Sequence, residues 1–512
     1  MTEEQKPQSN EKAVWNRVRL LSRNPITLAG VALSLVSLAN ILIFFLLDLV
    51  SSKSSPYIGI LAYMVAPGFL ILGLLLIFGG IWRERYRKVT EAPAEFPRYP
   101  RIDLNDPGQR SAIVFFGSFL VVFVMISAVG SYKAYEFTDS VKFCGQLCHT
   151  VMHPEYTAYQ YSSHARVACV ECHVGAGATW YVKSKLSGAR QVYKTILNTY
   201  PRPVQTPVHD LRPAQETCEQ CHWPRKFYGA QLKVFTHYSS DEKNTPRQIR
   251  MLIKTGGGDP STGAPEGIHW HMNIANEITY VAADVKRQVI AYVHVKDLQG
   301  HVTEYYAKDS TLTREQIANA PKHRMDCVDC HNRPTHIYVS PDQAVDQSLL
   351  AGRLNAALPY LKQQAVTALT GEYATTDAAL QGIAKSMHDF YESKYPDVAK
   401  TKAAEISGAI NEVQQIFQRT TFPEMKVNWQ THPNNIGHYY FNGCFRCHDG
   451  QHVSADGKIV PKDCNSCHTI LEQKDGAVRS IAMEGEKYKH PVDLGDISQV
   501  NCSDCHTGGV GP

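Results

Sequence analysis

Residues 144–173 read CGQLCHTVMHPEYTAYQYSSHARVACVECH. This stretch contains two cysteine pairs, and a histidine directly follows the second cysteine of each pair. The arrangement recurs five more times between residues 218 and 506, so that all 14 cysteines of the 512-residue chain belong to such a pair. A disulfide framework gives no reason for a histidine after every second cysteine. The pattern therefore indicates one repeated chemistry that uses two thiols and one imidazole.

The seven motifs have the arrangement in which two cysteines bind the vinyl groups of a haem and the adjacent histidine binds its iron. Zinc would need converging cysteine pairs and would not explain a histidine at every motif. Three residues separate the cysteines of the first motif, and we assign it to haem because the pair is otherwise unexplained. We expect thioether bonds from Cys144, Cys148, Cys169, Cys172, Cys218, Cys221, Cys327, Cys330, Cys444, Cys447, Cys464, Cys467, Cys502 and Cys505. The expected proximal iron ligands are His149, His173, His222, His331, His448, His468 and His506.

Each iron needs a sixth ligand, and 15 of the 22 histidines lie outside the motifs. A second histidine closes the iron to substrates and suits electron transfer. After the first motif, Met152 and His153 compete for one iron, and methionine would raise its reduction potential relative to a bis-histidine haem. The candidate distal ligands are Met152, His153, His164, His209, His269, His271, His323, His336, His432, His438, His452 and His490.

Three uncharged segments, 26–47, 57–82 and 111–132, are long enough to span a bilayer. The first is too long for the core of a signal peptide, and we interpret it as an uncleaved anchor. Lysine and arginine concentrate before the first segment and between the second and third, which predicts a cytoplasmic N-terminus. The chain after residue 132 would then lie in the periplasm, where haem attachment takes place. We therefore expect a bacterial inner-membrane protein, whereas the net charge of +4 gives no argument for nucleic acid.

The spacing of the motifs divides the chain. We predict a membrane anchor with three transmembrane helices at 1–132, a four-haem domain at 133–340 with an insertion at 223–326, a helical connector at 341–430 and a three-haem C-terminal domain at 431–512. With this density of haems we expect mostly short α-helices and loops wrapped around the haems, with a small β-containing insertion and without a large sheet.

Local patterns predict several elements within these domains. Alternating apolar and polar residues over 288–296, a turn at 299–300 and a second segment at 301–306 indicate a β-hairpin. A helix is predicted to start at Ser340, with apolar residues at helical spacing as far as Leu361. A second helix fits 397–419.

Residues 111–340 resemble the NapC/NirT/NrfH family of membrane-anchored quinol dehydrogenases. The resemblance rests on 148–173 and on CVDCHNRPTH at 327–336, and it implies that His164 and His336 are distal ligands. It also implies a quinol pocket near the first haem with a lysine after the second motif, which matches Lys185. The sequence departs from the family pattern in two places. Gln191 stands where a carboxylate is often found, and Met152 lies three residues after His149, not two.

The two additional anchor segments, the insertion and the last three motifs lie outside this family's basic pattern. Together they resemble the seven-haem ImcH-like inner-membrane cytochromes of metal-respiring bacteria. This resemblance implies oxidation of menaquinol and electron transfer to periplasmic c-type cytochromes, in anaerobic or extracellular (metal) respiration. Two alternatives stay open. One is a terminal multihaem reductase of a small nitrogen or sulfur oxyanion, and the other is a structural anchor for a separate enzyme.

Overall fold

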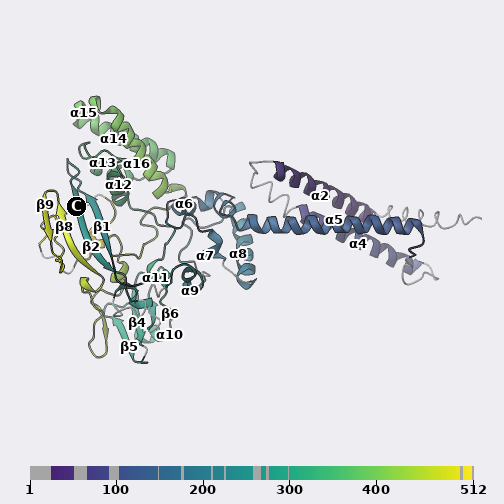
Figure 1. Ribbon diagram of the computed structural model, residues 1–512, viewed down its shortest axis with the longest axis horizontal. Helices are drawn as coiled ribbons and strands as arrows, with labels where there is room; N and C mark the ends of the chain where they lie inside the picture. The colour runs from purple at the N-terminus through teal and green to yellow at the C-terminus, as the bar shows by residue number, and fades with distance from the viewer. Residues whose placement is uncertain are drawn as a thin grey trace, which may run out of the picture. The chain divides into compact units, whose positions relative to one another are not determined.

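The computed structural model describes most of the chain as two compact units, 1–148 and 149–512 (Figure 1). The described residues are 25–50, 66–91, 103–147, 149–174, 178–208, 212–223, 227–257, 267–272, 276–297, 299–495 and 500–509. Long apolar helices make up the first unit. The second unit carries short helices, two sheets and six complete haem motifs.

The first unit contains helices α2 (Pro25–Val50), α4 (Ala66–Glu91) and α5 (Pro107–Thr138). Two stretches, Pro25–Ile43 and Ala66–Arg83, are long and apolar enough to cross a membrane. The predicted span 26–47 lies within α2, and the beginning of the span 57–82 lies outside the described residues. Helix α5 is 32 residues long and includes 111–132, but a third crossing stays a prediction.

Helices α2 and α4 pack through small residues. A Cβ atom on Gly73 would lie 2.5 Å from the Ser34 Oγ atom, and one on Gly80 would lie 2.4 Å from the Thr27 Oγ1 atom. Ile41 and Leu70 are buried at the other end of the same contact. Because the backbones approach so closely, this pair of helices depends on residues without bulky side chains, as is common between membrane helices.

Short helical elements in and beyond the second unit connect the haem motifs. The α-helices are α6 (His149–Gln160), α7 (Cys169–His173), α8 (Ala178–Ile196), α9 (Ala214–Thr217), α10 (Arg314–Asn319), α11 (Cys327–Cys330) and α17 (Cys502–Cys505). The π- and 3₁₀-helical turns are η2 (Lys142–Leu147), η3 (Cys218–Gln220), η6 (Ile268–Met272), η7 (Pro423–Met425), η8 (Gly443–Arg446) and η9 (Cys464–Ser466). The expected character of short helices and loops is therefore confirmed for much of this unit.

Two antiparallel sheets accompany these helices. The first has the order β1 (Ala230–Tyr238), β2 (Pro246–Lys254), β8 (His468–Asp475) and β9 (Val478–Ile481). The second has the order β6 (His323–Arg324), β3 (Glu277–Ala282), β4 (Ile290–Lys296), β5 (Val302–Ala307) and β7 (His452–Ser454). The predicted hairpin is confirmed as β4–β5. Strand β4 begins at Ile290 because the Gln288 and Val289 amides both donate to the Asp284 carboxylate, each over 2.8 Å.

The β structure is not confined to the insertion, to which the sequence analysis limits it. Strand β2 pairs with β8, and β5 pairs with β7, so that segments of the predicted insertion share both sheets with the C-terminal region. This pairing crosses the predicted boundary at residue 430. Local alternation of side chains predicts a strand but contains no information about a distant partner, which is why the sheets were underestimated.

The region 341–422 forms a helical layer around its own apolar core (Figure 1). The helices are α12 (Pro341–Leu350), α13 (Leu361–Leu369), α14 (Thr376–Lys394), α15 (Pro396–Thr401) and α16 (Ala403–Thr420). The predicted start is confirmed, since the Ser340 hydroxyl accepts the Gln343 amide over 3.4 Å. The first helix ends earlier than expected, because Gly352 at a φ of +69° breaks it shortly after Leu350. Lys402 has a non-helical conformation and divides the second predicted helix.

Candidate haem sites

Each described haem motif forms a helical turn. Six motifs begin α7, α11 or α17 or lie in η3, η8 or η9, and such a turn brings two cysteines three residues apart onto one side. The first motif differs, because its cysteines are four residues apart and η2 is a wider π-helical turn. All thirteen cysteines within the described part of the chain are free of disulfides. The thiols are therefore arranged as covalent haem attachment requires.

Six motif histidines each face a second histidine. The ring-centroid distances and interplanar angles are 6.3 Å and 40° for His173 and His336, 6.0 Å and 68° for His222 and His164, 6.5 Å and 6° for His331 and His269, 5.8 Å and 88° for His448 and His271, 6.1 Å and 27° for His468 and His438, and 6.2 Å and 40° for His506 and His490. Two metal–nitrogen bonds of about 2 Å, each extended by about 1 Å to the ring centre, separate opposed imidazoles by roughly 6 Å. The spacing in all six pairs fits one iron between two imidazoles.

Backbone carbonyls orient several of these rings. The Nδ1 atoms of His269, His336 and His448 hydrogen-bond to carbonyl oxygens over 2.6, 3.0 and 2.7 Å, and those of His271 and His490 do so over 2.9 Å. A hydrogen bond at Nδ1 fixes the tautomer and leaves the Nε2 lone pair for a metal. The donor set therefore fits haem iron.

Burial favours the neutral imidazole that iron ligation requires. It lowers the pKa values of His271, His336 and His438 below the ordinary histidine value. Nearby histidines lower them further, among them the motif histidines that these rings face. These rings are consequently held in the form whose lone pair can bind a metal.

Motifs that are neighbours in sequence also lie near one another in space. His164 lies five residues before the second motif and faces the histidine of the third. His438 lies shortly before the fifth motif and faces the histidine of the sixth. Tyr439 is adjacent to His438 and stacks on His506 of the seventh motif, with ring centroids 4.4 Å apart. This arrangement suits a series of closely spaced haems.

Several other candidate ligands have different surroundings. Both ring nitrogens of His452 are engaged, Nδ1 by Asp449 and Nε2 by the Ile290 carbonyl, each over 3.0 Å. Both ring nitrogens of His452 thus have protein partners in this structure, whereas an iron ligand needs one of them free. His432 is 5% exposed, and its Nδ1 atom lies 3.0 Å from the Thr206 hydroxyl.

The remaining candidates are placed less directly by the structure. The His323 ring lies 5.5 Å from that of Tyr280, and the His153 ring lies 5.2 Å from that of Phe422. Met152 lies on α6 and is partly buried. Cys148 and His209 lie outside the described residues, as do the side chains of His149 and Lys185.

The apolar N-terminal helices, the repeated thiol–imidazole motifs and the paired histidines define a membrane-anchored multihaem c-type cytochrome. Residues 107–222 match the NapC/NirT cytochrome c family, N-terminal region, and residues 438–509 match the cytochrome c3 family. The chain belongs to the NapC/NirT-type multihaem cytochromes, carries covalently bound haem c and functions in electron transfer.

Two relatives support this assignment. The chain is 49% identical over 497 residues to the cytochrome c-type protein ImcH of Geobacter sulfurreducens, which covers 96% of this chain and 97% of that protein. It is 34% identical over 115 residues to the cytochrome c-type protein NrfH of Wolinella succinogenes, which covers 22% of this chain and 63% of that protein. No solved structure matches the chain significantly.

Proposed function

We propose that this protein oxidises menaquinol at the periplasmic face of the inner membrane and transfers the electrons singly to periplasmic c-type cytochromes, in anaerobic or extracellular (metal) respiration. The N-terminus lies in the cytoplasm and the haem domain in the periplasm. The similarity to the NapC/NirT family supports quinol as the donor, and the near full-length similarity to ImcH supports the same role for the whole chain.

The observation that carries the proposal is the pairing of histidines. When bound, each haem supplies an iron that changes its oxidation state by one electron. The paired imidazoles would hold that iron from both sides, so that it could exchange electrons but would offer no free position to a substrate. A terminal reductase needs such a position, and each of the six motif histidines with described side chains faces another histidine.

Helix α8 supports quinol access from the membrane. Its exposed apolar residues Leu186, Tyr193 and Ile196 recur at helical spacing and are 69%, 65% and 76% exposed. Arg190 and Lys194 lie on the same helix. A helix with an apolar face and basic residues is suited to the surface of a bilayer with anionic lipids. A quinol could keep its tail in lipid while its headgroup reaches a haem beside this helix.

Lys185, also on α8, is the proposed hydrogen-bond donor to the quinol oxygen. Oxidation of a quinol to a quinone releases two electrons and two protons. An ammonium group near the oxygen stabilises the anion that develops as the proton leaves, because opposite charges attract strongly in a partly dehydrated site. The protons leave to the periplasm, and the electrons pass one at a time toward the acceptor.

Replacement of Lys185 tests this proposal. We expect Lys185→Ala to slow haem reduction by a menaquinol analogue by at least about tenfold, equivalent to about 1.4 kcal/mol of lost stabilisation. Reduction of all haems by dithionite should not change. Lys233→Ala, at an exposed position of strand β1, is the matched control and should retain wild-type kinetics. Wild-type quinol kinetics in a fully haem-loaded Lys185→Ala protein, measured by stopped-flow absorbance, would exclude this lysine.

A further inference from the structure

One short turn faces two different haem motifs. In η6, His269 faces His331 of the fourth motif with nearly parallel rings, and His271 faces His448 of the fifth motif with nearly perpendicular rings. The two residues are separated only by Trp270. Side chains two positions apart on a tight turn point in different directions, so the two imidazoles diverge toward separate partners. A single chain segment thereby reaches both motifs.

A glycine fixes the position of this turn. Gly257 has a φ of +110°, and a Cβ atom there would lie 2.3 Å from the Trp270 nitrogen and 2.8 Å from the His269 carbonyl carbon. The His269 amide donates to the Gly256 carbonyl over 3.1 Å. No side chain fits between this strand end and the turn. The orientation of both histidines consequently depends on a residue that touches neither motif.

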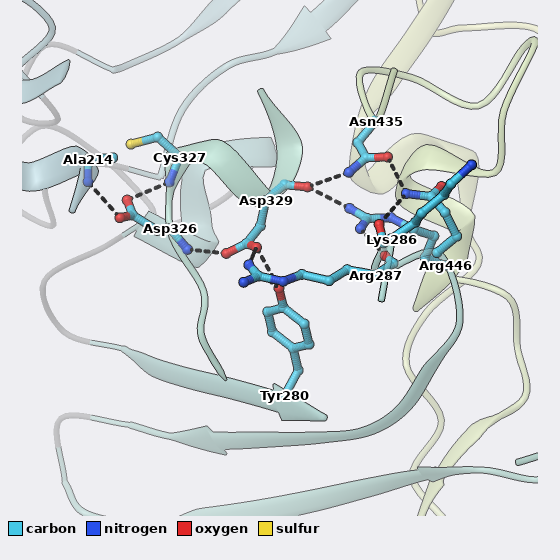
Figure 2. A network of polar contacts seen from close by, with 10 residues as sticks. Ala214, Tyr280, Lys286, Arg287, Asp326, Cys327, Asp329, Asn435 and Arg446 are labelled. Atoms are coloured by element: carbon cyan, nitrogen blue, oxygen red, sulfur yellow. Dashed lines mark hydrogen bonds and ion pairs between the residues drawn. The ribbon is translucent and has the colours of Figure 1, made fainter. Parts of the chain in front are cut away.

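A polar network joins the same two motifs independently (Figure 2). The Asp329 carbonyl, within the fourth motif, accepts the Arg446 Nη2 atom over 2.7 Å and the Asn435 side-chain amide over 2.9 Å. Arg446 lies between the cysteines of the fifth motif, and its Nη1 atom donates to the Arg287 carbonyl over 2.8 Å. The two motifs are thus connected by one direct hydrogen bond, and Asn435 and Arg287 extend the network around it.

The acidic side chains of this network extend it to the third motif. The Asp329 carboxylate accepts the Tyr280 hydroxyl over 2.5 Å and the Asp326 amide over 2.7 Å. The Asp326 carboxylate accepts the Ala214 amide over 2.8 Å, at the start of the helix before the third motif (Figure 2). Asp329 is 6% exposed, so these bonds are shielded from water and costly to break.

We propose that the turn 267–272 binds two haems at once, with His269 ligating the fourth-motif haem and His271 the fifth-motif haem. This turn is the junction between the first four haem motifs and the three C-terminal haem motifs. Electrons from the quinol would then pass at this turn from the fourth-motif haem to the fifth-motif haem. The inference rests on the proposed electron-transfer function. It adds the place at which electrons pass from the fourth-motif haem to the fifth-motif haem. The proposal thereby assigns a function to residues 223–326, which lie outside the family match.

Electron paramagnetic resonance of the oxidised full-length holoprotein tests the junction. Parallel imidazole planes give a rhombic low-spin signal, whereas perpendicular planes give a highly anisotropic one. His269→Met should remove one rhombic contribution, and His271→Met should remove one highly anisotropic contribution, each with an unchanged number of covalent haems. The proposal is overturned if either substitution leaves the spectrum unchanged or if both alter the same signal.

A third variant tests the turn without changing a ligand. Gly257→Ala should perturb both signals and slow reduction of the last three haems by menaquinol at least about tenfold. Gly300→Ala is the matched control, because Gly300 also has a positive φ of +83° but has open space at the Cβ position. The spectra are recorded after chemical oxidation, so a failure of quinol oxidation cannot affect them. Altered spectra in the variants, together with a wild-type protein that menaquinol does not reduce, would overturn the proposed donor alone. Unaltered spectra in the variants, together with normal quinol kinetics in the wild type, would overturn the junction alone.

Discussion

The ring nitrogens of individual histidines separate ligand candidates from structural residues. His336 has its Nδ1 atom bonded to the Glu155 carbonyl and faces His173, which leaves Nε2 for a metal. His452 is 1% exposed, but both of its nitrogens bond to protein atoms. A buried histidine with both ring nitrogens hydrogen-bonded to protein atoms stabilises the fold. A histidine with its Nε2 atom left opposite another imidazole is arranged to bind an iron.

At this scale we predict that His336→Met changes the ligation of one haem without loss of any haem. The cysteines hold the haem covalently, and the methionine sulfur should raise its reduction potential. A redox titration followed by absorbance measures the shift. In the control His452→Gln, all potentials should stay the same, while the free energy of unfolding falls by about 1–3 kcal/mol. Identical potentials in His336→Met and wild type would remove His336 from the ligands.

At the scale of elements, close backbone contact distinguishes α2 and α4 from the helices of the second unit. Thr27 is 7% exposed and contacts the backbone of α4 at Gly80. The helical layer of the second unit is instead held by large side chains such as Ile383 and Phe417, which are fully buried. The difference is expected, because water drives burial of large apolar groups, whereas in lipid close packing replaces that driving force.

The small-residue contact gives a prediction with a neighbouring control. Gly80→Leu should destabilise the packing of α2 against α4 by about 1–3 kcal/mol, because the new side chain collides with Thr27. Gly79→Leu should have little effect, since a Cβ atom at that position meets no atom within 4 Å. Loss of helical circular dichroism on heating in detergent measures both. Equal midpoints for the two variants would contradict this packing.

For the whole molecule, the arrangement of the motifs supports a continuous series of haems. The second motif is linked to the third through His164, and the sixth to the seventh through Tyr439. The turn 267–272 supplies the link between the fourth and fifth motifs. From the second motif to the seventh, these links would let an electron move through the domain in short steps.

The motifs of the whole molecule also predict the number of covalently bound haems. Intact-mass spectrometry of the holoprotein should show the 57.2 kDa polypeptide plus seven haems, because every motif supplies two thiols and a histidine. Substitution of both Cys144 and Cys148 by alanine should remove one haem mass. A wild-type product with six haems, unchanged by this double substitution, would show that the first motif does not bind haem.

The sequence alone determined the chemistry and the local elements of this protein. The thiol–imidazole motifs, the apolar segments and the β4–β5 hairpin depend on residues close together in the chain, so their patterns are visible without a structure. A helix start such as Ser340 belongs to the same class, since its capping hydrogen bond spans three residues.

Only the tertiary structure decided which groups meet. His336 faces His173 rather than its own motif's His331, and His271 faces His448 from a segment far away in sequence. Strand β2 likewise finds its partner in β8. Haem attachment needs a few adjacent residues, but a sixth ligand or a strand partner needs only proximity in space. That proximity results from packing of the whole domain, which no local pattern encodes.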